Sequence, residues 1–181
     1  MGLLSYTELC ELVEQGVINA PLENVNGASI DLTLSANLLI ESNLIVNPEI
    51  DLKSKQNINN HQFIMDENGY VIAPGEFLLA ATNEIFSLPD DIAAEFKLKS
   101  SQARNGLFHA IAGHADPGFN GSNLTLEFHN VNRYHSLIIK PNMPCGQMLF
   151  YRVKPVPKER SYSTVGQYNG ALGVIASKGI R

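Results

Sequence analysis

Apolar and polar residues alternate in several short runs of the chain, and this alternation predicts β-strands. The clearest runs are residues 29–34 and 124–128, in which every second side chain is apolar. Further strand candidates are the runs 74–80, 93–98, 136–140 and 146–151. Turns rich in Gly and Pro separate these runs. Short strands at this spacing are typical of an all-β sandwich or barrel.

The two ends of the chain have different patterns. Ser5 and Glu8 form a capping box, an apolar stripe follows at Leu9, Leu12 and Val13, and Gly16 ends it, so a short N-terminal packing helix is expected. From Pro155 onward the chain is rich in Ser, Gly, Lys and Pro, and its periodicity is weak. We therefore expect a β domain over residues 1–154 and a mobile C-terminal arm over residues 155–181.

Polar connections are expected between the strands. The Asn-rich segment Glu41–Gln62 has no motif and is interpreted as a long connection or an irregular excursion. Glu84, Asp90 and Asp91 are interpreted as solvated turn residues.

Composition narrows the class of protein. The chain has 181 residues, enough for one domain with a real core, and a formal net charge of −5. It has no basic block that would indicate a nucleic-acid surface, and no leader-like or membrane-length apolar run, so a cytoplasmic protein without a membrane or nucleic-acid partner is expected. Cys10 and Cys145 form no zinc-type pair or disulfide framework and are expected to be small buried or half-buried residues.

Polar groups concentrate between Leu98 and Asn130. Here Lys99, Ser100, Ser101 and Arg104 follow a strand and precede an Asn-Gly stop signal, so Ser100 or Ser101 is expected to cap one helical turn. Free backbone N–H groups, two hydroxyls and two cations together suit a phosphate.

Two carboxylates follow in the same stretch. Asp116 stands at the entry of a Pro-Gly turn, just after Gly113, which allows close approach of a ligand or of backbone. Glu127 lies in an apolar strand, where a lone Glu is most often on a solvated face. The proximity of Asp116, Arg104 and the paired serines favours a functional site instead.

Three ordered motifs in this stretch resemble the dCTP deaminase branch of the dUTPase-like superfamily. They are Lys99-Ser100-Ser101-x-x-Arg104-x-Gly106-Leu107, Ala112-Gly113-x-Ala115-Asp116-Pro117-Gly118-Phe119 and Leu126-Glu127-Phe128-His129-Asn130. Asn26-Gly27-Ala28-x-x-Asp31-Leu32 and the runs at 74–84 and 88–93 extend the resemblance over nearly the whole chain. It implies a distorted β-barrel or jelly roll, a homotrimer with sites between subunits, and a pyrimidine deoxynucleoside triphosphate as ligand, with Mg²⁺ held mainly by its phosphates.

The resemblance also implies a chemistry, which is hydrolytic deamination of dCTP to dUTP. Glu127 would shuttle protons, for which its pKa would have to be lifted towards neutrality, and Arg104 and Ser100 would hold the water and stabilise the intermediate. Backbone at Ala112 and Gly113 would contact the base or the water, and Asp116 the 3′-hydroxyl. Further substrate contacts are expected from Lys99, Ser101, Gln147, Tyr162, Gln167 and Tyr168. Zinc is not expected, because Pro144-Cys145 lacks a second Cys three residues on and the chain has no His-x-Glu.

Two alternatives remain open. Ala112-Gly113 follows the type of family member that also hydrolyses dUTP to dUMP, with Asp116 activating the water, although His114 replaces an aromatic residue there. In the arm, Gln167 and Ala171 replace the family's Lys and Gln. Losing one phosphate-binding ammonium removes roughly 1.5–3 kcal/mol, so weaker triphosphate binding, another substrate or a catalytically silent nucleotide-binding relative is the other alternative.

Overall fold

The computed structural model describes residues 2–44, 48–54 and 57–179. Its strands are β1 (Gly2–Leu3), β2 (Ile30–Thr33), β3 (Asn37–Glu41), β4 (Asn60–Ile64), β5 (Tyr70–Ile72), β6 (Phe77–Ser87), β7 (Ile92–Leu98), β8 (Leu107–His109), β9 (His114–Ala115), β10 (Asn120–Asn130), β11 (Leu137–Ile139) and β12 (Pro144–Arg152). The α-helices are α1 (Tyr6–Glu14), α2 (Ser100–Ala103) and α3 (Tyr162–Val165), with one 3₁₀ turn at Leu22–Asn24. The expected mainly β architecture is confirmed.

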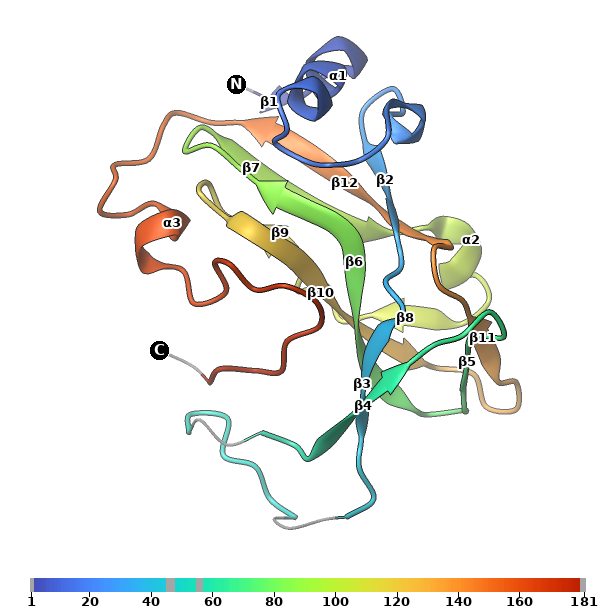
Figure 1. Ribbon diagram of the computed structural model, residues 1–181. Coiled ribbons are helices and arrows are strands. Elements are labelled where there is room, and N and C mark those ends of the chain that lie inside the picture. The colour runs from blue at the N-terminus through green and yellow to red at the C-terminus, as the bar shows by residue number, and fades with distance from the viewer. Residues whose placement is uncertain (1, 45–47, 55–56, 180–181) are drawn as a thin grey trace.

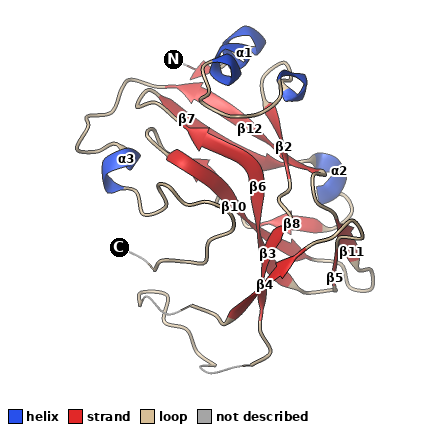
Figure 2. Cartoon of the chain, in the orientation of Figure 1, coloured by secondary structure: helices blue, strands red, loops and turns tan. Residues whose placement is uncertain are grey.

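Within the described residues, the strands pair into two larger sheets and a small one. The first has the order β1-β12-β7-β9, and β2 also pairs with β12; the second has the order β4-β3-β6-β10-β8; β11 pairs with β5. All of these pairings are antiparallel. The strands form the body of the molecule and the helices lie at its periphery (Figures 1 and 2). In Figure 1, α2 and α3 lie on opposite sides of this body.

The core lies between the sheets and contains the apolar positions that alternation predicted. On β10, Leu124, Leu126 and Phe128 are buried, whereas Thr125 and Glu127 on the opposite face are only half-buried. Because successive strand residues point to opposite faces, one face of β10 packs into the core and the other is free to line a site.

The N-terminal helix prediction is also confirmed. In α1, Ser5 and Glu8 form the capping box, and Leu9 and Leu12 are buried. Cys10 is half-buried and Cys145 is buried, as expected. Burial raises the pKa of the Cys145 thiol far above its ordinary value.

The prediction for Glu84 as a solvated turn residue is wrong. Glu84 lies within β6, is 4% exposed, and accepts hydrogen bonds from the backbone N–H and the hydroxyl of Thr33. Burial raises the pKa of this carboxyl, and the Thr33 bonds offset part of that shift. The carboxylate therefore ties β6 to β2 in the interior.

Two neighbouring carboxylates are also structural. Asp90 accepts a 2.5 Å hydrogen bond from the buried Ser161 hydroxyl, and Asp91 pairs with Arg152 at 2.9 Å. Both lie in the turn between β6 and β7, as expected, but each is half-buried and bonded to a partner, so the interpretation of them as solvated is wrong.

The long connection after β3 is shorter than predicted. Glu41, where the connection was expected to begin, is the last residue of β3, and residues 60–62 already belong to β4 and pair with β3. Residues 45–47 and 55–56 of this segment, and residues 180–181 of the arm, lie outside the described residues.

The C-terminal arm folds back along β10 of its own chain. Its backbone joins β10 through Gly170 N–H to Asn120 O (3.0 Å) and Asn123 N–H to Ala171 O (3.0 Å). Ala171 is buried against the core, and Ser122 Oγ donates to Tyr168 O at 2.7 Å. The division at residues 154 and 155 and the mobility of the arm remain predictions.

Candidate active site

A cavity of about 620 Å³ lies between β10, β9, the segment after β3 and the arm. Its walls are largely apolar, with Glu127 as the carboxylate among the described lining residues. From the expected site, Ala112, His114, Glu127, Tyr162 and Tyr168 line it. The other lining residues include Leu79, Ala115, Phe119, Asn123, Thr125, Ile175 and Ser177. This arrangement suits a mostly apolar ligand, such as a base and sugar, that meets a few polar groups.

Glu127 faces a histidine that sequence reasoning missed. Nε2 of His109 lies 3.4 Å from Oε2 of Glu127, and both atoms are buried without a hydrogen-bond partner in the described part of the chain. Nδ1 of His109 accepts a hydrogen bond from the Ile111 N–H at 3.2 Å, so a neutral His109 carries its proton on Nε2, towards the carboxylate. The pair can therefore orient a carboxylate whose other oxygen is open to the cavity.

Aromatic packing fixes the His109 ring. The side chain is 5% exposed, and its ring lies 4.6 Å from the ring of Phe96 and 6.0 Å from that of Phe128, centroid to centroid. The sequence did carry a signal for this histidine. In β8, Leu107 and His109 are buried and Phe108 between them is exposed, so alternation alone would have pointed His109 inward.

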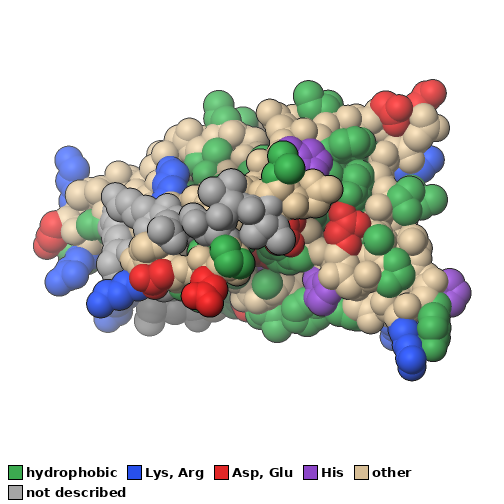
Figure 3. Space-filling model, turned by 90° about the horizontal axis from the view of Figure 1, so that it is seen from below, with side chains coloured by type: hydrophobic (Ala, Val, Ile, Leu, Met, Phe, Trp, Pro, Cys, Tyr) green, Lys and Arg blue, Asp and Glu red, His purple; other side chains and the backbone are tan. Residues whose placement is uncertain are grey.

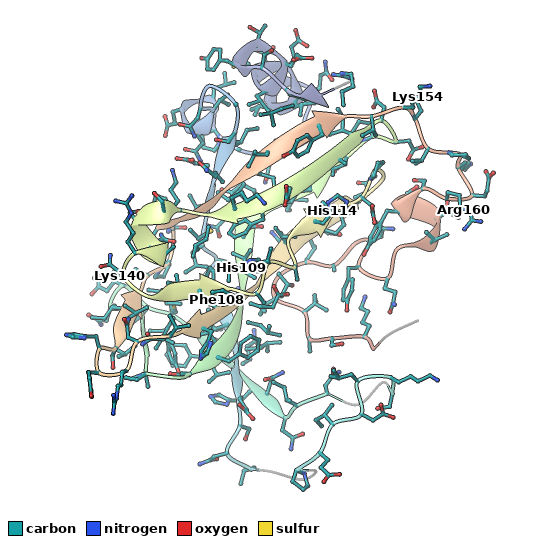
Figure 4. The ribbon with its side chains drawn as sticks, turned by 180° about the vertical axis from the view of Figure 1, so that it is seen from behind. Phe108, His109, His114, Lys140, Lys154 and Arg160 are labelled. Atoms are coloured by element: carbon teal, nitrogen blue, oxygen red, sulfur yellow. The ribbon has the colours of Figure 1, made fainter. Side chains whose placement is uncertain are left out.

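Gly113 has a packing role beside this pair. A Cβ atom at this position would lie 2.5 Å from Cβ of Phe96, and the Gly113 carbonyl accepts a hydrogen bond from the Phe96 N–H at 2.8 Å. In Figure 4 the chain runs from His109 in the middle of the molecule to His114, towards the side on which Arg160 lies. Gly113 therefore allows a close approach of Phe96, and the contact of its backbone with a ligand stays a prediction.

Asp116 stands at the entry of its turn, as predicted, and is more open than Glu127. Its side chain is 62% exposed, and Oδ1 lies 3.3 Å from Nε2 of the exposed His114. The next residues attach this turn to the root of the arm. Pro117 O accepts from the Tyr162 N–H at 2.9 Å, and Gly118, at φ 88°, leaves no room for a Cβ beside the Ser161 hydroxyl. The position of the Asp116 turn and that of the arm are therefore linked.

The residues that were expected to bind phosphate lie in another part of the chain. Ser100, Ser101 and Arg104 are exposed on or beside α2, and Arg104 lines a second cavity of about 560 Å³ with Asn132 and His135. The predicted cap is wrong by one residue, because α2 is preceded by Lys99 as its N-cap and Ser100 is already helical. The structure does not bring this group to Glu127 within one chain.

Two further expected residues lie together near α2. Nζ of Lys99 pairs with Oδ2 of Asp31 at 2.5 Å. Gln147 is the register partner of Asp31 between β12 and β2, and its Oε1 lies 3.5 Å from the Ser29 hydroxyl. Gln167 lies in the arm but is not among the residues that line the cavity, although its neighbour Tyr168 is.

Two features are absent from the part of the chain that the structure describes. No group of three or more His, Cys, Asp and Glu side chains there is arranged to hold a metal ion. No helix among them is long and apolar enough to cross a membrane.

The fold and these motifs define a protein of the dCTP deaminase-like family, to which the chain belongs, because the family model matches residues 3–153. Among its relatives, the "dCTP deaminase, dUMP-forming" of Persephonella marina is 34% identical over 183 residues, which cover 97% of this chain and 96% of that protein. The protein of the same name from Dictyoglomus thermophilum is 32% identical over 97% of this chain and 94% of its own. The expected family is therefore confirmed, and with it membership of a hydrolase family.

A solved structure supports the fold. The 2′-deoxycytidine 5′-triphosphate deaminase of Agrobacterium tumefaciens matches with a TM-score of 0.65 at 19% identity, over 83% of this chain and 49% of that one. The expected dUTPase-like fold class is confirmed.

Proposed function

We propose that the protein converts dCTP to dUMP in the cytoplasm, as part of pyrimidine deoxynucleotide metabolism, by deaminating the base and cleaving the triphosphate. The observation that carries this proposal is the Glu127 carboxylate, held against His109 in a cavity of a chain that aligns along nearly its full length with dUMP-forming relatives. The names of these relatives favour the bifunctional alternative over the release of dUTP, which the sequence analysis had put first.

Deamination requires a water molecule to add at C4 of cytosine and ammonia to leave. Glu127 takes one proton from the attacking water and delivers it to N3, which keeps it. Glu127 then carries the second proton, from the new hydroxyl at C4, to the leaving amine, so that water and dCTP give dUTP and ammonia. His109 keeps the carboxylate aimed at the cavity. No step in this scheme uses zinc.

Cleavage of the triphosphate requires a second water at the α-phosphate, which gives dUMP and pyrophosphate. Asp116 is the candidate base, because its exposed carboxylate directly follows Ala115, which lines the cavity, and contacts His114, which lines it too. Mg²⁺ is usually bound by one or two carboxylates together with substrate phosphates. The single exposed carboxylate of Asp116 therefore suits a Mg²⁺ ion that is held mainly by the phosphates. Such an ion would neutralise negative charge on the substrate phosphates.

The separation of α2 from the cavity supports a site shared between subunits. Ser100, Ser101 and Arg104 are exposed on one side of the chain, and Glu127 and Asp116 belong to another region. A homotrimer would place the α2 group of one subunit against the Glu127 cavity of the next. Arg104 and Ser100 would then hold the attacking water and stabilise the developing charge.

The test is a product assay with dCTP and, separately, dUTP in the presence of Mg²⁺. We expect dUMP from both substrates and ammonia from dCTP only. Glu127→Gln should stop ammonia release but leave dUMP formation from dUTP, and Asp116→Asn should do the reverse and let dUTP accumulate. Release of dUTP as the final product from dCTP would reduce the function to deamination. No turnover of either nucleotide would favour a binding-only relative.

A further inference from the structure

The cavity around Glu127 lacks a positive charge for its expected ligand. No Lys or Arg is among the described residues that line it. Of the two cations that the sequence offered for phosphate, Lys99 is paired with Asp31, and Arg104 lines the second cavity. On the face seen from below, Lys and Arg side chains lie mainly towards the two ends, with hydrophobic and acidic side chains between them (Figure 3). An anionic ligand in this cavity therefore needs a cation from elsewhere.

The end of the arm places a cation, the ammonium of Lys178, at the edge of this cavity. The backbone N–H of Lys178 donates to the Tyr168 hydroxyl at 3.1 Å, and its Nζ donates to Gln167 O at 2.6 Å. The same Nζ lies 5.0 Å from the centroid of the Tyr168 ring. Tyr168 and Ser177, the residue before Lys178, both line the cavity. Three contacts thus hold an exposed ammonium at the edge of the site.

We propose that Lys178 binds the phosphate chain of a pyrimidine deoxynucleoside triphosphate, and so supplies the positive charge that Gln167 lacks. This inference rests on the proposed function, because it assumes that the nucleotide occupies the cavity of Glu127. An ammonium has three N–H donors, and the bond to Gln167 O uses one, so two remain for phosphate oxygens. The Tyr168 ring stabilises the cation in the free protein by a cation–π contact. The arm therefore carries its charge eleven residues after Gln167.

The test measures nucleotide affinity in four proteins by titration calorimetry in the Glu127→Gln background, which removes deamination. They are the parent, Lys178→Gln, the charge relocation Gln167→Lys/Lys178→Gln, and the control Lys154→Gln. Lys154 is an exposed cation beyond the end of β12 (Figure 4). The ligands are dCTP and dCMP with Ca²⁺ in place of Mg²⁺, at two salt concentrations.

We expect Lys178→Gln to weaken dCTP binding about tenfold, equivalent to ~1.4 kcal/mol, and dCMP binding much less. The relocated charge should restore most of the affinity, because it places an ammonium at the position whose carbonyl Lys178 contacts. The loss should shrink at high salt, and Lys154→Gln should bind as the parent does. Equal dCTP affinity of the parent and Lys178→Gln would overturn the inference, as would equal losses for dCTP and dCMP.

Failure of this inference can be distinguished from failure of the proposed function. If the wild-type protein turns over dCTP but Lys178→Gln binds it normally, only the role of Lys178 is wrong. If dCTP binds through Lys178 but neither ammonia nor dUMP is released, the proposed function fails and the phosphate contact stands. If no nucleotide binds, both are wrong. Thermal unfolding of each variant checks that the fold is intact.

Discussion

Nε2 of His109 lies 3.4 Å from Oε2 of Glu127, and neither atom has a hydrogen-bond partner among the described residues. A buried polar atom without a partner is costly, so this distance should shorten when the site is loaded. A lone carboxylate on a strand would be free to rotate. Here a ring fixed by Phe96 and Phe128 limits where the carboxylate can point.

Replacement of His109 by Phe should lower kcat about 10²-fold with a smaller effect on KM. Phe keeps the contacts with Phe96 and Phe128 but removes the N–H that faces Glu127, and a misplaced catalytic group costs about this much. His109→Gln can still donate a hydrogen bond and should recover part of the loss. The measurement is steady-state ammonia release from dCTP. His129→Phe, on β10, is the matched control, and an unchanged kcat in His109→Phe would leave His109 a packing role only.

Substitution Gly113→Ala should destabilise the fold by about 1–3 kcal/mol, the usual cost of overpacking. The new Cβ would lie 2.5 Å from Cβ of Phe96 and would displace the ring that holds His109, so activity should fall as well. Gly27→Ala is the control, because no atom lies within 4 Å of a Cβ built there. Urea unfolding measures both, and equal stabilities of the two variants would contradict the packing argument.

The buried carboxyl of Glu84 should make stability depend on pH. Its pKa is raised above the ordinary 4.5, so the folded protein retains this proton to higher pH than the unfolded chain does. The stability that the proton contributes is fully present below pH ~4.5 and is lost as pH rises through the raised pKa. Glu84→Gln should therefore gain stability relative to the wild type between pH 4.5 and 7. Unfolding by urea across this range measures the difference, with Glu67→Gln on an exposed turn as the control. Parallel curves of unfolding free energy against pH for the wild type and Glu84→Gln would contradict this role of the Glu84 proton.

The side chain of Asn123 should control the attachment of the arm. Its Nδ2 donates to the carbonyls of Thr82 and Glu84 on β6, while its Oδ1 accepts from the Gly173 N–H at 2.8 Å. Asn123→Ala breaks this bridge, so trypsin should cut after Lys178 several times faster. The rate of loss of the C-terminal peptide by mass spectrometry gives the measurement. Asn68→Ala, on the β4–β5 turn, is the control, and an unchanged cleavage rate would show that the backbone bonds alone hold the arm.

Much of the fold could be predicted because it follows from local patterns. The period of two located β2 and the middle of β10, and the capping box located α1. Glu84 was misjudged because its partner, Thr33, lies on a distant strand, and a pattern confined to β6 cannot show that a carboxylate is buried. The same limit applies to Asp90, whose partner Ser161 lies in the arm.

The candidate site was predicted in part for the same reason. Glu127 and the segment at Ala112 were found by motif, and both line the cavity. Arg104 was expected to join them from a neighbouring subunit. Within one chain β8 separates α2 from the cavity and Arg104 lines another cavity, so its place in the site stays a prediction. His109 belongs to none of the three motifs, and the contacts of Lys178 with Tyr168 and Gln167 follow from the fold of the arm, which no motif shows.

The position of the arm along β10 has a consequence for solubility. β8 pairs with β10 only from Phe128 to Asn130. The arm occupies the same edge of β10 from Asn120 to Asn123, where it is bonded through Gly170 and Ala171. Without the arm, these backbone groups would be an unpaired strand edge next to apolar side chains, a site at which one copy of the chain can add to another. A protein truncated before Gln167 should therefore aggregate in proportion to its concentration. Loss of activity in such a truncated protein would then reflect the incorrect association of its chains as much as the absence of the arm from the site.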